Sequence, residues 1–161
     1  GSSSLGPKKI VGNMTIENSA QLILTGTIWV TGNVIIKNDA RVQLASGYGS
    51  TSGVLIADGT IVVENNSVSS GSGSAGSYLM YLSTSSFNPA ITIKNNAIVD
   101  ILYASQGFVQ VENNAQMREV TGNGLRVKNN ATVTYEIGLQ DAAFTSGPGG
   151  GWKVTSWKEI E

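Results

Sequence analysis

The sequence predicts an all-β fold, a single-stranded parallel β-helix (β-solenoid) of about six to seven coils. The first observation is a five-residue phrase that occurs six times: a β-branched residue, a charge, Asn, a small polar residue, then Ala or Ser. The second is an alternation of apolar and polar residues before each phrase. The third is a strict alternation of charge sign from one copy to the next. Together they indicate stacked, equivalent coils.

The strand before each phrase supplies two apolar columns. Its residues alternate with period two, so every second side chain points to the same face. One column is predicted to contain Met14, Val34, Ile61, Ile91, Val109 and Leu125. The other is predicted to contain Ile16, Ile36, Val63, Ile93, Val111 and Val127. Both columns would be buried in the interior of the stack.

The Asn of each phrase is predicted to form a corner. Successive Asn positions are 20, 27, 30, 18 and 16 residues apart, and a coil of a parallel β-helix has about this length. Asn tolerates the left-handed backbone conformation of a sharp bend. Stacked in register, the first Asn of each phrase would form an amide ladder between coils. The predicted ladder is Asn18, Asn38, Asn65, Asn95, Asn113 and Asn129.

The charged position of the phrase predicts a second column on the surface. In chain order it reads Glu17, Lys37, Glu64, Lys94, Glu112 and Lys128. Parallel strands lie about 4.8 Å apart, so neighbouring coils would place opposite charges side by side. Exposed pairs contribute about 0.2–1 kcal/mol each, and a slip by one coil would bring like charges together. We assign this column a structural role.

Composition excludes several functions. The 161 residues contain no Cys and no His, which excludes disulfides, Cys/His metal sites and any catalytic triad built on His. The net charge is −1, so no basic surface is expected for nucleic acid. No apolar run reaches the ~20 residues of a membrane span. No cofactor is predicted.

Three parts of the chain are distinguished. Residues 1–6 resemble an expression-tag remnant, residues 7–137 form the predicted β-helix domain, and residues 138–161 form a predicted capping tail. Within the domain, a second strand follows each corner, and a third is expected near Trp29 and at 54–57, 78–82 and 101–103. Residues 138–145 suggest one helical turn. After a glycine-rich linker, the tail is predicted to pack Trp152 and Trp157 on the stack.

Gly/Ser-rich insertions at 45–53, 69–77 and 83–88 lengthen the middle coils. Insertions in stacked repeats often form loops at one corner, on the binding face. The aromatic residues near them are therefore the candidate ligand contacts. They are Tyr48, Tyr78, Tyr81, Phe87 and Tyr103. The alternative is that these rings pack beneath the loops or into the core.

An enzyme is an alternative hypothesis, because parallel β-helices include polysaccharide lyases and hydrolases. Such reactions require clustered carboxylates in a groove. Outside the charge column the acidic residues are scattered, and only Asp58 and Asp100, which both lie in or just after the third strand of a coil, could approach one another. Their separation is predicted to be about 10 Å, a distance compatible with an inverting hydrolase. Neither has a convincing second partner, so no catalytic or metal residue is assigned.

Two features resemble known proteins. The repeated phrase resembles bacterial right-handed β-helix surface proteins. The ending Ser146-Gly147-Pro148-Gly149-Gly150-Gly151-Trp152-Lys153-Val154 with Ser156-Trp157-Lys158-Glu159 is similar to the C-terminus of PilX-like type IV pilus assembly proteins. The resemblance covers residues 7–161 and implies right-handed winding and a bacterial extracellular domain. The pilin-like helix of that family does not occur in this sequence.

Three functions follow as hypotheses. The first is a non-enzymatic extracellular structural or adhesion module at the bacterial cell surface, with surface or pilus proteins or glycans as partners. The second is a carbohydrate-binding or polysaccharide-processing module with sugars stacked on Tyr78, Tyr81 or Tyr103, which predicts exposed rings. The third is a self-assembling β-helical filament protein, which predicts uncapped apolar ends.

Overall fold

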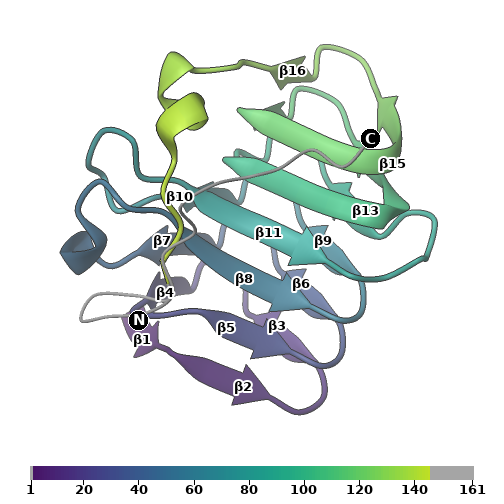
Figure 1. Cartoon of the computed structure of the whole chain (residues 1–161). Helices are drawn as coiled ribbons and strands as arrows, with labels where there is room; N and C mark the ends of the chain where they lie inside the picture. The colour runs from purple at the N-terminus through teal and green to yellow at the C-terminus, as the bar shows by residue number, and fades with distance from the viewer. Residues whose placement is uncertain (1, 146–161) are drawn as a thin grey trace.

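A computed structural model describes residues 2–145 and has an all-β fold of parallel strands (Figure 1). The all-β class and the parallel pairing are confirmed. The strands pair side by side in three columns around one core and form a nearly closed, barrel-like arrangement. The chain visits the columns in a fixed order, which we name A, B and C.

Column A holds the strands that follow the corners, and its first member lies at the N-terminus. They are β1 (Ser2–Leu5), β4 (Gln21–Leu24), β7 (Arg41–Leu44), β10 (Val68–Ser70), β14 (Gln116–Met117) and β16 (Thr132–Val133). The bridges of Ile98 to Val68 and Gln116 connect β10 with β14. Every pairing in this column is parallel.

Columns B and C belong to one ten-stranded sheet. Column B begins with β2 (Lys8–Ile10), β5 (Ile28–Val30), β8 (Gly53–Ala57) and β11 (Leu79–Ser83). Column C begins with β3 (Met14–Ile16), β6 (Val34–Ile36), β9 (Ile61–Val63) and β12 (Ile91–Ile93). Two long strands, β13 (Ile101–Val111) and β15 (Glu119–Val127), then run through both columns and join them.

The register of the two inner columns predicted from the sequence is confirmed in column C, and their burial is confirmed for every member except Leu125 and Val127, which are exposed. Met14 pairs with Val34, and the row continues through Ile61, Ile91 and Val109 to Leu125. Residues between them point outward, as the buried–half-buried–buried pattern of β6, β9 and β12 shows. Burying an aliphatic side chain contributes about 1.5–3 kcal/mol, so these rows are the main stabilising element.

The corners follow each copy of the phrase. A positive φ near 60° occurs at the residue after the first Asn of each corner: Ser19, Asp39, Asn66, Asn96, Asn114 and Asn130. The next residue is fully buried in the four central copies, Ala40, Ser67, Ala97 and Ala115. A small residue fits there because the chain turns toward the core. The predicted corner is confirmed.

The two ends of the chain differ from the sequence prediction in one respect. Residues 2–5, predicted as part of a tag remnant, form β1 and pair along the edge of β4. At the other end, the helical turn expected at 138–145 is a 3-10 helix, η2 (Ile137–Asp141). The predicted packing of Trp152 and Trp157 concerns residues that lie outside those that the structure describes. Within residues 2–145 no helix is long and apolar enough to span a membrane.

The insertions leave the stack at two corners, so the expectation of one shared corner is wrong. Residues 45–52, with the 3-10 helix η1 (Ser46–Tyr48), and residues 71–78 both lie between columns A and B. The Ser72 and Ser77 hydroxyls donate to the backbone oxygens of Gly49 and Thr51 and tie these two loops together. Residues 84–90 lie instead between columns B and C.

Candidate functional site

The charged column forms ion pairs between successive coils. Lys37 Nζ lies 2.7 Å from Glu17 Oε2, Lys94 Nζ lies 3.5 Å from Glu64 Oε1, and Lys128 Nζ lies 3.2 Å from Glu112 Oε1. All three pairs are at least partly exposed to solvent, so each contributes about 0.2–1 kcal/mol. The column links the first coil to the second, the third to the fourth and the fifth to the sixth.

The amides at the corners are hydrogen-bonded unevenly. At the first Asn, Asn65 Nδ2 donates to Asn38 Oδ1, while Asn113 uses its backbone N–H to reach Asn95 Oδ1. The hydrogen bonds of the described residues therefore do not form the predicted continuous row of amides from Asn18 to Asn129. The second Asn carries the longer row, from Asn114 through Asn96 to Asn66. The sequence prediction placed the row on the first Asn of each phrase instead, because the pattern of residues does not show which of two adjacent Asn side chains points toward the neighbouring coil.

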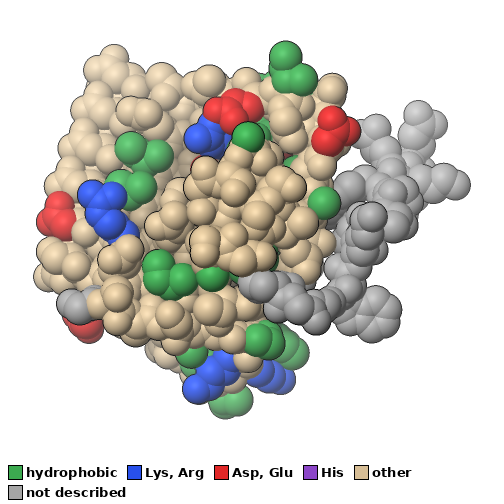
Figure 2. Space-filling view, turned by 90° about the vertical axis from the view of Figure 1, so that its left-hand side faces the viewer, with side chains coloured by type: hydrophobic (Ala, Val, Ile, Leu, Met, Phe, Trp, Pro, Cys, Tyr) green, Lys and Arg blue, Asp and Glu red, His purple; other side chains and the backbone are tan. Residues whose placement is uncertain are grey.

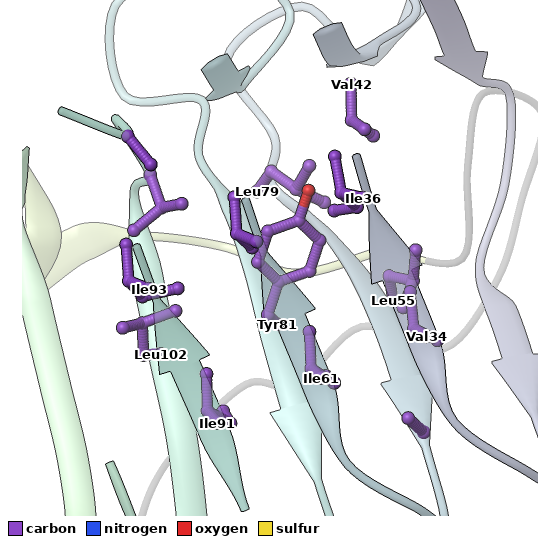
Figure 3. Packing of buried hydrophobic residues seen from close by; sticks show 14 of the residues in the cluster. Val34, Ile36, Val42, Leu55, Ile61, Leu79, Tyr81, Ile91, Ile93 and Leu102 are labelled. Carbon is purple, nitrogen blue, oxygen red and sulfur yellow. The ribbon is translucent and has the colours of Figure 1, made fainter. Parts of the chain in front are cut away.

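The aromatic candidates are mostly interior. Tyr48, Tyr78 and Tyr81 are buried, so the expectation that they offer a face to a ligand is wrong. Tyr81 lies among Leu55, Ile61 and Leu79 in the core (Figure 3), because its place in β11 pairs it with buried Leu55 and Leu102. Burial raises the pKa of Tyr81, and its hydroxyl donates to Ser69 Oγ at 2.6 Å.

The two remaining aromatic candidates reach solvent at separate places. Phe87 is exposed on the loop between β11 and β12. Tyr103 is half-buried and lines a pocket of about 240 Å³ on the outer face of β11, β13 and β15. Met80, Glu119, Leu139 and Phe144 line the same pocket. The structure therefore does not gather the five aromatic residues into one platform.

The two carboxylates considered for hydrolysis lie at opposite ends of their strands. Asp100 aligns with Leu79 and Gly53 in column B, whereas Asp58 follows β8, five residues further along. Five residues of a strand span about 17 Å. The predicted separation of about 10 Å is therefore wrong, because it includes only the stacking distance between coils and not the offset along the strands. Asp58 is exposed and accepts a hydrogen bond from Trp29 Nε1.

Asp100 is a buried carboxylate at the centre of a polar cluster. Its Oδ2 accepts the backbone N–H groups of Gly71 and Leu79 at 2.9 and 3.0 Å, and its Oδ1 accepts Arg118 Nε at 3.0 Å. Arg118 also forms an ion pair with Glu136. Both oxygens of Asp100 are thus occupied by groups of the protein, which is the arrangement of a structural carboxylate.

Residues 134–145, here named the strap, run from β16 past η2 and down the side of the stack (Figure 1). Near the start of the strap, Glu136 forms an ion pair with Arg118 and accepts a hydrogen bond of 3.2 Å from the Tyr78 hydroxyl. Its end is held at Ser52, whose N–H donates to Ala143 O and whose carbonyl accepts the Thr145 N–H. The strap therefore covers part of the outer face of column B and closes the Tyr103 pocket on one side.

The surface carries few charges. On the face of Figure 2, charged side chains lie singly or in small groups among uncharged atoms. No group of three or more Asp and Glu side chains that could hold a metal ion occurs within the described part of the chain. Comparison with protein-family models, with curated proteins and with solved structures gives no match.

Proposed function

We propose that the chain is a structural module without catalytic activity, built as a single-stranded parallel β-helix. Support comes from the pairing of each strand with its equivalent in the next copy of the repeat, in all three columns. We extend the proposal to right-handed winding, because crossovers between parallel strands are right-handed in almost all proteins. A fold of this kind makes a rigid rod whose length is set by the number of coils.

The proposal that the chain has no catalytic activity rests on the hydrogen bonds of its buried carboxylate, Asp100. Asp100 is only 4 % exposed and accepts three hydrogen bonds from its own chain. A general acid or base needs a proton-accepting atom within reach of a substrate. Asp58, the other candidate, is exposed but lies far along the strand from Asp100. Neither arrangement supports a hydrolytic pair.

We also propose a bacterial extracellular or cell-surface location, with pilus or other surface proteins as partners. This part is supported by the resemblance of residues 146–159 to PilX-like pilus assembly proteins.

Two measurements test this proposal: the cleavage of polysaccharides by the chain, and the free energy of unfolding of its variants. The full chain is incubated with a panel of neutral and acidic polysaccharides, and new reducing ends and unsaturated products are measured. We expect none. Asp100→Ala is expected to lower the free energy of unfolding by about 3 kcal/mol, because it leaves two buried N–H groups without an acceptor and removes one of the two carboxylates that pair with Arg118. Asp58→Ala is the control and should lower it by about 0.5 kcal/mol. Polysaccharide cleavage that Asp100→Ala or Asp58→Ala abolishes would refute the proposal.

Glycan binding is a second candidate, favoured by one observation. The half-buried Tyr103 ring lines the 240 Å³ pocket together with Glu119 and Gln140, and aromatic rings flanked by polar groups bind sugars in many proteins. Tyr103→Ala should abolish any signal on a glycan array, whereas Phe87→Ala, which removes an exposed ring elsewhere, should not. An array on which both variants and the native chain bind equally would exclude this pocket.

A further inference from the structure

The upper end of the stack, formed by β15 and β16, leaves core positions uncovered. Leu125, Val127 and Val133 are 51 %, 46 % and 45 % exposed. Their equivalents one coil below, Val109, Val111 and Met117, are at most 2 % exposed. The exposed residues therefore occupy interior positions of a repeat that lacks a neighbour on one side within residues 2–145.

The lower end, formed by β1, β2 and β3, offers a complementary surface. A cavity of about 350 Å³ lies there, and its apolar lining consists of Leu5, Met14, Ile16, Ala20 and Leu22. Met14 and Ile16 are the first members of the two rows that end at Leu125 and Val127. A coil placed beneath Met14 and Ile16 would therefore contact apolar side chains at the same positions of the repeat as every inner coil does.

The backbone shows which bonds such a contact would make. At all five steps between successive corners, the charged residue donates its N–H to the preceding coil, as Lys128 does to Val111 O. At the same five steps, the second corner residue donates to the next coil, as Asn114 does to Asn129 O. Within residues 2–145, the pattern leaves Val127 O as an acceptor and Asn130 N–H as a donor at the upper end. At the lower end it leaves the Glu17 N–H and the Asn18 carbonyl.

The charge column makes the two ends electrostatically complementary. It begins with Glu17 at the lower end and finishes with Lys128 at the upper end. Placing the lower end of one chain on the upper end of another would set these two residues side by side, as Glu112 and Lys128 are within the chain. An upper-to-upper contact would bring two Lys128 residues together.

We propose that the upper end of one chain binds the lower end of a second copy, continuing the strands of columns B and C. This inference rests on the structural role proposed above and identifies a second copy of the chain as the binding partner of the stack. Leu125 and Val127 then lie against Met14 and Ile16 of the second copy, and Lys128 lies against its Glu17. Because the interface joins two different surfaces, further copies can add to either end.

Two features of the lower end limit this association. In column A, β16 of the first copy would pair with β4 of the second, whose edge is occupied by β1. β1 must therefore leave; its Ser2–Ser4 side chains are already exposed, but half-buried Leu5 loses its contact with the core and no longer lines the cavity. In column B, Lys8 pairs with buried Ile28 and lies on the inner side of the first strand. An inward charge at an edge opposes pairing, so Lys8→Leu should strengthen association.

Sedimentation velocity of the full chain at low ionic strength, over a range of concentrations, is the first test. We expect association that Leu125→Asp weakens by more than about tenfold, because a carboxylate would be buried in the junction. Phe87→Asp, at an exposed ring away from both ends, is the control and should change nothing. Lys128→Glu should weaken association about tenfold, and Lys128→Glu with Glu17→Lys should restore it. Lys94→Glu breaks an inner pair of the same kind and should leave association unchanged.

A disulfide test fixes the register, because the chain has no cysteine of its own. Thr15 and Arg126 lie on the outer side of the same row at opposite ends of the stack. Within one chain they are five strand spacings apart, about 24 Å, whereas across the proposed junction they are neighbours at about 4.8 Å. Thr15→Cys with Arg126→Cys should give a ladder of disulfide-linked species, and each single variant at most a dimer.

A native chain that stays monomeric up to its solubility limit would overturn the inference, as would a double-cysteine variant without a ladder. These failures are separate from failure of the structural role, which would appear as polysaccharide cleavage whatever the oligomeric state.

Discussion

The buried residues Tyr48 and Tyr81 differ in the hydrogen bonding of their hydroxyl groups. Tyr81 donates to Ser69 Oγ at 2.6 Å, whereas the buried Tyr48 hydroxyl has no hydrogen-bond partner among the described residues. An unpaired buried hydroxyl costs about 1–3 kcal/mol, and a paired one contributes about 1 kcal/mol. The two residues should therefore respond oppositely to loss of the hydroxyl.

Tyr48→Phe is expected to raise the free energy of unfolding by about 1 kcal/mol, since it removes an unpaired polar atom and keeps the ring. Tyr81→Phe is expected to lower it by about 1 kcal/mol, since Ser69 loses its partner. Urea denaturation followed by circular dichroism measures both. Equal shifts of the same sign would contradict the assigned hydrogen bonds.

The same tyrosines predict an alkaline limit to stability. Burial raises the pKa of both above the unfolded value of 10.0, and for Tyr81 the charge of Asp100 adds to this while the Ser69 hydrogen bond acts against it. Below about pH 10 both states keep the proton, so stability is complete. Above it the unfolded chain loses protons that the folded chain retains, and stability falls by up to about 1.4 kcal/mol per pH unit for each tyrosine.

Urea midpoints measured between about pH 8 and pH 11 test this limit. Tyr81→Phe should flatten the fall relative to the native chain, which separates the tyrosine contribution from that of the exposed lysines. An unchanged slope in Tyr81→Phe would show that another group dominates.

Residue positions were predictable where the repeat fixes them. The repeated phrase predicted the two inner rows and the corner, because all six copies have the same position relative to the alternation of apolar and polar residues. The orientation of Tyr81 was not predictable, because β11 lies between two insertions and its side-chain phase depends on the pairing of Tyr81 with Leu55 and Leu102. The role of Asp100 was missed for a related reason, since its partners Gly71 and Arg118 lie far from it in the sequence.

At the scale of elements, the strap is attached by few contacts. Arg118 and Tyr78 hold Glu136 at its start, and Ser52 bonds to Ala143 and Thr145 near its end. Between them, Leu139 packs against Tyr78 and Ile101. Such a segment can open locally while the strands remain paired.

Glu136→Ala should therefore speed amide hydrogen exchange at Leu139, Ala142 and Thr145 by about tenfold or more, while the inner strands keep their protection. The expected change in global stability is small, within about 1 kcal/mol, because the Glu136 side chain is partly exposed to solvent. Glu119→Ala, at the same pocket, is the control. Exchange that rises equally in β9 and β12 would show that the strap is part of the cooperative core.

Elements outside the repeat were the least predictable. β1 has a Ser-rich sequence with no apolar alternation, and it is a strand because it lies along the free edge of β4. The loop 84–90 leaves at a different corner from the other two insertions, because the position of an insertion depends on the strands it joins and not on its composition. The strands of columns A and B were predicted, since each follows a corner or carries its own apolar residues.

At the scale of the molecule, one repeated phrase determines the interior, the corners and the surface charge together. Each copy places two apolar residues inside, one charge outside and one bend, so every coil adds the same contacts to its neighbours. The proposed rod and the proposed end-to-end association both follow from this equivalence. Both proposals require that the first and last copies of the phrase lie in one row, at opposite ends of a single stack.

A distance between those copies tests this claim most directly. Spin labels on Thr15→Cys and Arg126→Cys, measured by pulsed electron resonance at a concentration low enough to keep the chain monomeric, report the length of the row. Five strand spacings predict a single narrow distribution near 24 Å, widened only by the label linkers. A broad distribution, or a maximum far from that distance, would contradict the stacked arrangement and with it the proposed rod.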